Sequence, residues 1–296
     1  MFPKLLIINA DDFGASKGVN AAVARVRQYG LLTSASLMVT GNAVDEAVSI
    51  ARSDPQLTVG LHLALSNAHC VLDPEQIPDL VGADGKFGNN PAACAFRYYF
   101  DRRVKKQLES EIEAQFEAFA RTGLPLSHVD GHQHLHMHPA LLPTVIELAR
   151  RYGAKGIRLP RDPLLANLRV DRTCLGLKMI TAIGHAYLAR AGKHALDECK
   201  LSVCDLSIGA MMSGAMSIDY VIGMLDTARA KSVELFFHPC AFGLTYPQGP
   251  NHGDMKTLLD PRLREYVAAK GFIPATYADL TMMREGEAPA EPEATE

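Results

Sequence analysis

The sequence has no excess of basic residues and no long apolar run. Its 296 residues carry 30 Lys and Arg against 33 Asp and Glu, which gives a formal net charge of −3. Because a nucleic-acid-binding surface must neutralise phosphates, this balance argues against a nucleic-acid partner. The most apolar stretch, LSIGAMMSGAMSI, is interrupted by Ser and Gly and falls short of the roughly 18 residues that span a bilayer. We therefore expect a protein that does not cross a membrane.

Cysteine pairs and targeting segments are also lacking. The six cysteines are scattered without a C-x-x-C pair, which favours reduced thiols over a disulfide framework or a zinc ribbon. The first residues, MFPKLLIINADD, reach two acids after a short apolar run, unlike a signal peptide or an anchor. The expected location is the cytoplasm, and contact with the inner face of the membrane is left open.

Short β-rich runs alternate with amphipathic stretches along most of the chain, a pattern typical of βαβ units with a parallel sheet. About seven such units in one domain predict an α/β fold and favour a barrel or incomplete barrel over an open sheet. The predicted strands cover residues 4–10, 34–39, 57–63, 126–132, 156–160, 234–239 and 272–277. The predicted helices lie near 17–29, 43–52, 104–121, 139–151, 218–231 and 260–269, the fourth beginning at Pro139.

Two regions interrupt this alternation. Residues 66–103 are rich in Pro, Gly and Asn, and residues 161–217 combine apolar helical stretches with a Met/Gly segment. We expect both to be insertions at the C-terminal face of the barrel. The predicted domain covers residues 1–283, and the acidic, Pro/Ala-rich segment 284–296 is predicted to be a disordered tail.

Four of the predicted strands end in residues that bind metals or transfer protons. In parallel β/α folds, active groups gather where strands end, so these residues are expected to converge. They are Asp11 and Asp12 after LLIINA, His62 in VGLHL, the histidine cluster of SHVDGHQHLHMHP at 127–139, and His238 in ELFFHP.

Two adjacent carboxylates at the end of an apolar strand repel each other unless something takes up charge. A bound divalent cation would do so, and Asp12 with two imidazoles would make a two-His-one-carboxylate site with open positions. Asp11 would then serve as a general base acting on water. The alternative is a turn and helix-cap pair, although Ser16 can supply that cap.

The histidine cluster offers more candidates than one site needs. An extended chain would turn Asp130 and all the cluster histidines to one face, since they occupy even positions. A helix would instead place His128 beside His132, or His134 beside His138, four residues apart on one face. Spacing alone does not choose, so the roles of these side chains stay open: His128, His132, His134, His136 and His138.

Four segments in order, INADDFGASKGVN, VGLHLALS, SHVDGHQHLHMHP and FFHP, resemble the signatures of the YdjC-like (ChbG/HpnK) carbohydrate deacetylases. IPDLV, the segment before the histidine cluster, and LSIGAMMSGAMS are most similar to the HpnK type, which is associated with hopanoid biosynthesis. The resemblance implies a distorted TIM-like barrel and a metal-dependent N-deacetylase, a hydrolase of carbohydrate metabolism. It covers nearly the whole chain.

Carried over to this sequence, the resemblance implies one divalent metal ion, Mg²⁺ or Zn²⁺, on Asp12, His62 and His132. It implies Asp11 as the catalytic base and His238 as the proton donor to the leaving amine. Arg158 in GIRLP, at another strand end, could contact Asp11 or the substrate, or form a solvated salt bridge.

The substrate implied by the resemblance is an N-acetylamino sugar, most specifically an N-acetylglucosaminyl hopanoid. The alternatives are a chitooligosaccharide deacetylase and a metal phosphohydrolase. A glycoside hydrolase is disfavoured because its two carboxylates flank the scissile bond and need no histidines. Met211, Met212 and Met216 are expected to lie in the core; if they were exposed instead, the patch would favour the lipid substrate. A peripheral membrane contact and a homodimer are left open.

Overall fold

The computed structural model describes residues 4–243, 245 and 249–286, apart from the side chains at 193, 194 and 197. Its centre is an eight-stranded sheet in which every ladder is parallel. The strands are β1 Lys4–Phe13, β2 Ser34–Leu37, β3 Thr58–Leu63, β4 Leu126–Gly131, β5 Gly156–Ile157, β6 Leu206–Ile208, β7 Ser232–Phe237 and β8 Phe272–Pro274.

β1 is the central strand of the sheet. The sheet runs β5-β4-β3-β2-β1-β7-β6, and β8 pairs with the start of β1. All of β1 after Lys4 is buried, as expected for a parallel strand covered on both faces. Near the two ends of this order, isolated bridges in the described part of the chain join Gly156 of β5 to Ser202, before β6, and Ser207 of β6 to Arg161, after β5. The sheet therefore curls into a barrel with one weakly closed seam, which confirms the predicted distorted (β/α) barrel.

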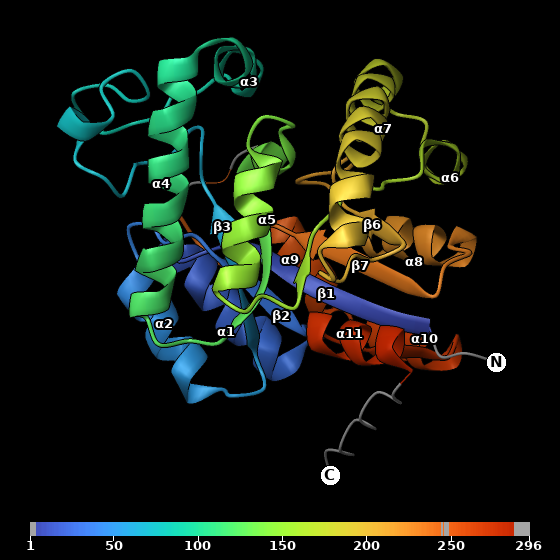
Figure 1. Cartoon of the computed structure of the whole chain (residues 1–296). Helices are drawn as coiled ribbons and strands as arrows, with labels where there is room; N and C mark the ends of the chain where they lie inside the picture. Colours follow the sequence, from blue (N-terminus) through green and yellow to red (C-terminus); the bar gives the residue numbers. More distant parts are fainter. Residues whose placement is uncertain (1–3, 244, 246–248, 287–296) are drawn as a thin grey trace.

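Helices surround the sheet (Figure 1). α1 begins where predicted because the Ser16 hydroxyl accepts a hydrogen bond from the backbone N–H of Val19. The helices are α1 Lys17–Tyr29, α2 Val44–Ser53, α3 Pro91–Phe100, α4 Arg102–Arg121, α5 Leu142–Arg151, α6 Leu164–Val170, α7 Leu175–Glu198, α8 Ile218–Thr227, α9 His252–Leu259, α10 Pro261–Ala269 and α11 Tyr277–Glu285, with the 3₁₀ segments η1 Pro74–Gln76 and η2 His132–Met137. None of the described helices combines the length and the hydropathy that crossing a membrane requires.

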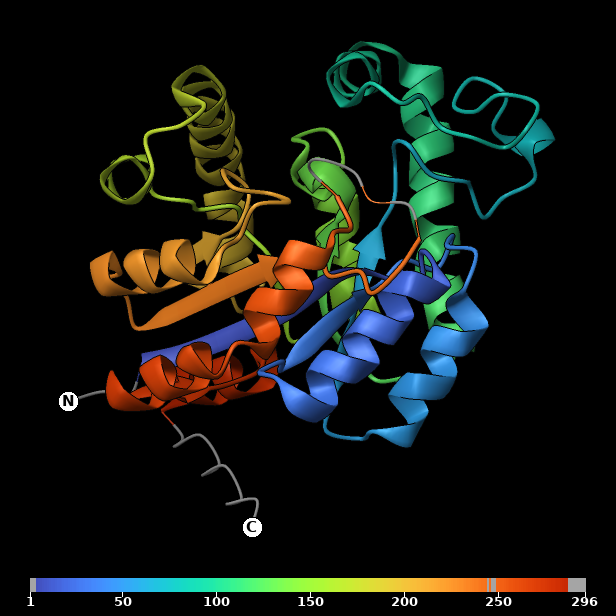
Figure 2. The same cartoon turned by 180° about the vertical axis from the view of Figure 1, so that it is seen from behind.

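The two segments expected to be insertions form two projections on one side of the molecule. α3 with the upper part of α4 makes one, and α6 with α7 makes the other; η2 and the start of α5 lie between them (Figures 1 and 2). The second segment also contains β6, a strand of the barrel, so the count is eight strands where about seven were expected.

Several predicted boundaries are wrong. The helix expected from Pro139 begins at Leu142, with Pro143 in its first turn, because η2 and a turn occupy the residues before it. The strand expected over 272–277 ends at Pro274, and a capping box between Thr276 and Asp279 starts α11 there. α11 also takes in the first two residues of the predicted tail, and residues 287–296 of that tail lie outside the described residues.

Candidate metal centre and active site

Parallel pairing brings the predicted strand ends together. Asp11 and Asp12 lie near the end of β1, and His62 lies near the end of β3, two strands away. In the β3–β4 ladder His62 is directly opposite Asp130, and His132 follows β4 by one residue. All of these groups therefore meet at the carboxyl end of the sheet, where β/α barrels carry their active sites.

Asp12, His62 and His132 converge as the resemblance implied. Asp12 Oδ1 lies 3.1 Å from His132 Nδ1 and 3.3 Å from His62 Nε2. One ligand atom from each of the three lies within 4.8 Å of the others, a spacing that a single cation can bridge. The His132 side chain is 18% exposed, against 1% for His62 and 3% for Asp12, so the site opens to solvent beside His132. Two imidazoles and one carboxylate leave open positions for water and substrate.

The surroundings of these ligands fit a bound divalent cation. His62 Nε2 is buried and has no hydrogen-bond partner, although Asp12 faces it. The other ring nitrogen, Nδ1, lies 2.9 Å from Asp130 Oδ1, an arrangement that orients metal-binding imidazoles. Asp12 also has a left-handed backbone with φ of 62°, a conformation that is uncommon for non-glycine residues and that recurs at functional sites. A polar atom left unpaired in this position is one that an ion would satisfy.

The titration behaviour of the ligands is consistent with a site that exchanges protons for a cation. Although burial lowers it, the neighbouring carboxylates of Asp130, Asp12 and Asp11 raise the pKa of His62 to about 10. Although burial raises it, His132 and His62 hold the pKa of Asp12 well below its usual range. Without a bound ion, the protonated imidazole of His62 therefore balances the negative charge of the Asp12 carboxylate.

A second grouping of possible ligand atoms, from Asp11, His62 and Asp130, also exists. It suits a cation poorly, because both of its carboxylates already bind Arg158. That guanidinium lies 2.6 Å from Asp11 Oδ2 and 2.8 Å from Asp130 Oδ2. A cation there would face a fixed positive charge, so the set containing Asp12 is the better metal site.

Asp11 is held rather than free. Arg158 donates to both of its oxygens, at 2.6 and 2.8 Å, and Asn9 Nδ2 donates to Oδ1 at 2.8 Å. Arg158 is fully buried, packs 4.4 Å from the Phe236 ring centre, and also donates to Glu234 at 3.0 Å. Burial opposes the charge, but these carboxylates raise the pKa of Arg158 further above its ordinary value. Of the roles left open for Arg158, the structure shows the contact with Asp11.

His238 directly follows β7 and lies beside Asp11. Its Nε2 lies 3.8 Å from Asp11 Oδ2, and its Nδ1 lies 3.5 Å from the Ser213 hydroxyl. The backbone N–H of His238 donates to Asp254 at 2.8 Å, which fixes the end of the strand. The side chain is 12% exposed, so its ring lies at the mouth of the site.

The histidine cluster is neither extended nor α-helical. Gln133 and His134 both have left-handed φ angles, 55° and 58°, and this turn reverses the chain directly after His132. His136 Nε2 lies 2.9 Å from the carbonyl of Arg158, and His128 stacks on Tyr277 at 4.7 Å. These two imidazoles are buried and have lowered pKa values, first of all because of burial. Neither imidazole belongs to the candidate ligand set of Asp12, His62 and His132.

The remaining cluster members contact the projections. His134 packs against His185 of α7, with ring centres 5.1 Å apart. His138 lies 5.9 Å from Tyr99 of α3, ring centre to ring centre. The two projections are thus anchored on η2, the segment that carries His132.

Sequence reasoning missed Asn9 and Glu234, and left Asp130 without a role. Each lies in a fully buried part of its strand, and Asn9 and Glu234 directly follow apolar residues; that contrast is the signal that could have identified those two. Glu234 accepts from Tyr277, Ser207 and Arg158, each at 3.0 Å, and Ser36 donates to Asp130 at 2.6 Å. Together they form the polar support beneath the site.

The fold and the site define a (β/α) barrel with a candidate mononuclear metal centre at the carboxyl ends of its strands. The model of the YdjC-like protein family matches residues 5–269, and the chain belongs to this family. It is 36% identical to a carbohydrate deacetylase of Brevibacillus brevis over 93% of this chain and 99% of that one. It is 29% identical to a chitooligosaccharide deacetylase of Serratia marcescens over 94% of this chain and 99% of the relative.

A solved structure supports the fold independently. A protein of Enterococcus faecalis, proposed to be a cellobiose-phosphate cleavage protein, superposes with a TM-score of 0.71 at 24% identity. The match covers 94% of this chain and 99% of that chain. At this identity the likeness concerns the fold alone.

Proposed function

We propose that this protein is a metal-dependent carbohydrate deacetylase that hydrolyses the N-acetyl group of an N-acetylamino sugar. The observation that carries the proposal is the convergence of Asp12, His62 and His132 beside the carboxylate of Asp11. A divalent cation bound there, Mg²⁺ or Zn²⁺, would supply Lewis acidity toward the acetamide carbonyl and the attacking water. Membership of a family whose named relatives are deacetylases supports the same reaction.

Two side chains of the protein would then carry out the proton transfers, one as acceptor and one as donor. Asp11 accepts the proton of the water that attacks the acetamide carbon, and Arg158 holds its carboxylate in one orientation. His238, whose Nε2 lies 3.8 Å from Asp11 Oδ2, gives a proton to the amine nitrogen as the C–N bond breaks. Water and amide become acetate and a protonated amine, and the proton taken up by Asp11 restores the one given by His238, so atoms and charge balance.

We propose a glycolipid of the N-acetylglucosaminyl hopanoid type as the substrate. The Met/Gly segment does not supply the apolar surface expected for it, because Met211 is 6% exposed and Met216 is 1% exposed. Exposed apolar side chains lie instead on α3 and α7, two of the helices that contact η2. An apolar aglycone could lie against either helix while the sugar enters beside His132.

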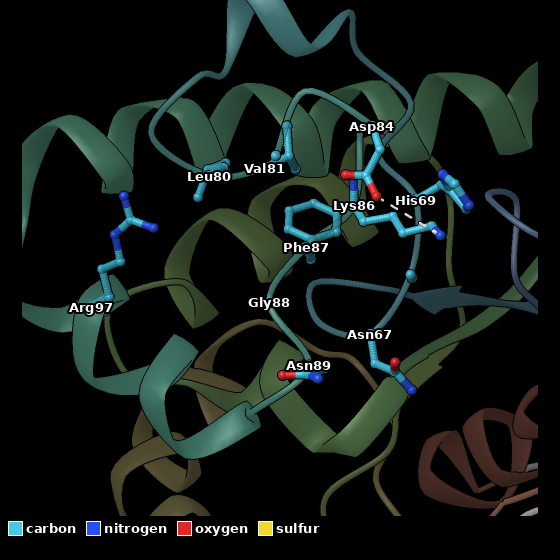
Figure 3. A pocket seen from close by; sticks show the side chains of 12 residues that line it. Asn67, His69, Leu80, Val81, Asp84, Lys86, Phe87, Gly88, Asn89 and Arg97 are labelled. Carbon is cyan, nitrogen blue, oxygen red and sulfur yellow. Dashed lines mark hydrogen bonds and ion pairs between the residues drawn. The ribbon is translucent and has the colours of Figure 1, made fainter.

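A water-soluble N-acetylated chitooligosaccharide is the second candidate, and a cavity favours it. This cavity, of about 730 Å³, lies in the segment after β3 and is drawn in Figure 3. Asn67, His69, Asp84 and Lys86 provide hydrogen-bonding groups around Phe87, and Arg97 lies at the opposite side. Such a lining suits further sugar units.

The experiment is an acetate-release assay with metal-stripped and metal-restored protein. It compares N-acetylglucosaminyl hopanoid, N-acetylated chitooligosaccharides and a chromogenic phosphate ester. Acetate release that depends on Mg²⁺ or Zn²⁺ is expected, with the hopanoid preferred. The variants Asp12→Ala and His132→Ala should lose both metal and activity, whereas Asp45→Ala, which removes an exposed carboxylate of α2 outside the ligand set, should keep both. Phosphate release without acetate release would reject the deacetylase in favour of a phosphohydrolase.

A further inference from the structure

Helix α7 exposes apolar side chains on most sides of its first four turns. Over residues 175–189, LGLKMITAIGHAYLA, the one charged residue is Lys178, which is buried against Asp171. Ile180 and Ile183 are 70% and 69% exposed. The other large exposed apolar side chains of this helix are Leu175, Leu177, Met179 and Tyr187. A contiguous apolar surface of this kind usually marks a contact with something else.

Helix α3 presents a second apolar surface, made of aromatic rings. Phe96 and Phe100 are 68% and 67% exposed, with ring centres 4.7 Å apart. Tyr99, 56% exposed, packs on Phe100 at 5.0 Å. Clustered Phe and Tyr side chains at a protein tip are typical of residues that enter the interfacial layer of a bilayer.

Basic residues surround both apolar surfaces. Residues 91–106 contain five Arg and Lys against one acid, and residues 164–190 contain four against one, in a chain whose formal net charge is −3. Arg97, Arg169, Arg172 and Arg190 are exposed. These two segments are therefore net positive, opposite in sign to the whole chain, which favours an anionic partner at α3, α6 and α7.

A cavity between α6 and α7 combines both properties. It has a volume of about 350 Å³ and is lined by Leu165, Leu168, Arg169, Arg172 and Leu175. Three leucines with two guanidinium groups suit the junction between a lipid acyl chain and its phosphate.

We propose that α3, α6 and α7 form a membrane-docking surface that binds an anionic lipid bilayer. The two projections lie on the same side of the molecule and flank η2, so docking would bring the mouth of the site toward the lipid (Figures 1 and 2). A second copy of the chain fits less well, because pairing this surface with itself would oppose basic residues with basic residues. Membrane binding goes beyond the proposed function, and it can be measured without any turnover of substrate.

The test is flotation of the full chain with lipid vesicles. Vesicles of phosphatidylcholine alone are compared with vesicles that contain about one third phosphatidylglycerol. Binding to the anionic vesicles is expected, with little binding to the neutral ones, and it should weaken as salt is raised. The double variants Ile180→Ser/Ile183→Ser and Phe96→Ser/Phe100→Ser should each lower partitioning into vesicles about tenfold or more. Each removes exposed apolar area that would become buried in the bilayer on binding.

Arg169→Gln/Arg172→Gln should abolish the preference for anionic vesicles while leaving the apolar helices intact. The matched controls are Tyr29→Ser and Met282→Ser, two exposed apolar residues outside the proposed surface, which should bind as the wild type does. Thermal unfolding of every variant checks that the fold is kept.

Three results would overturn the proposal: no vesicle binding by the wild type, equal loss in the control variants, or self-association through α7 that anionic vesicles do not displace. Acetate release from N-acetylglucosaminyl hopanoid and from N-acetylated chitooligosaccharides is measured separately. Its absence with both substrates, with vesicle binding intact, would reject the proposed function and leave the docking surface standing.

Discussion

Arg158 binds both oxygens of Asp11, through Nη1 to Oδ2 at 2.6 Å and through Nη2 to Oδ1 at 2.8 Å. The pair is fully buried, and the two residues are 147 positions apart in the chain. A fork of two parallel hydrogen bonds fixes the plane of the carboxylate as well as its position. The group proposed as the base is therefore preorganised, with His238 3.8 Å from one of its oxygens.

Replacing Asp11 with Asn should remove turnover and keep the metal. The amide has the same size but cannot accept the proton of water, and removal of a general base typically costs roughly 10²–10⁴-fold in rate. Acetate release and metal content by elemental analysis are measured on the same sample. Wild-type turnover by Asp11→Asn with its metal bound would show that the base is another group.

Replacing Arg158 with Met should destabilise the fold strongly. Three buried carboxylates, Asp11, Asp130 and Glu234, would lose their shared cation, and breaking a buried ion pair typically costs about 3–5 kcal/mol. The double variant Arg158→Met/Glu234→Gln should regain part of this loss, because one unpaired charge fewer is buried. Urea unfolding of both variants and of Glu234→Gln alone measures the difference. Equal stability of the two Arg158 variants would contradict this account.

Binding of the cation should release protons, and affinity should rise with pH. His62, with its pKa raised to about 10 by neighbouring carboxylates that outweigh burial, carries a proton at neutral pH when no ion is present. An ion must displace that proton, so lower pH favours the protonated, metal-free form. Calorimetric titration with Zn²⁺ or Mg²⁺ in buffers of different ionisation enthalpy counts the protons released. A count of zero at neutral pH would contradict the prediction.

Replacing His238 with Gln should impair amide hydrolysis far more than ester hydrolysis. An amine needs a proton to leave, whereas 4-nitrophenolate leaves without one. We expect a loss of roughly 10²–10⁴-fold with the N-acetylamino sugar and little change with 4-nitrophenyl acetate. Equal losses on both substrates would assign His238 to substrate binding or to positioning Asp11, with no role in protonation.

Asp162 should make stability fall as pH rises from about 4 to about 6. It accepts hydrogen bonds from Met211 N–H, Gly209 N–H and Asn167, yet burial raises the pKa of its carboxyl to about 6. Because the folded pKa lies above the unfolded value, the folded protein binds more protons in this window, and that stabilisation is lost on going to neutral pH.

In Asp162→Asn this titration is absent. The free energy of unfolding of the variant, relative to the wild type, should therefore rise by up to about 2 to 3 kcal/mol between pH 4 and pH 7. Urea unfolding at several pH values measures the difference. A pH-independent difference would show that the Asp162 carboxyl titrates normally.

The sequence predicted the class of fold and the strands that carry the site. Its predictions of elements and boundaries were wrong where contacts with other parts of the chain decide the local structure. The short strand β6 was not predicted, because three residues beside a Met/Gly segment show no periodicity. Helix α5 was predicted to begin too early, because η2 and the turn after it precede Leu142. By contrast, the expectation that the Met residues lie in the core is confirmed for Met211 and Met216.

By itself, the sequence determined that acids and histidines stand at the ends of apolar strands, since alternation, caps and motif order are local properties of the chain. Only the tertiary structure decided which imidazoles face Asp12 and which group holds Asp11. The left-handed turn at Gln133 and His134 selects His132 from its neighbours, and strand pairing places His62 opposite Asp130. These contacts join residues far apart in the chain, and they depend on strand order and register, which local patterns do not encode.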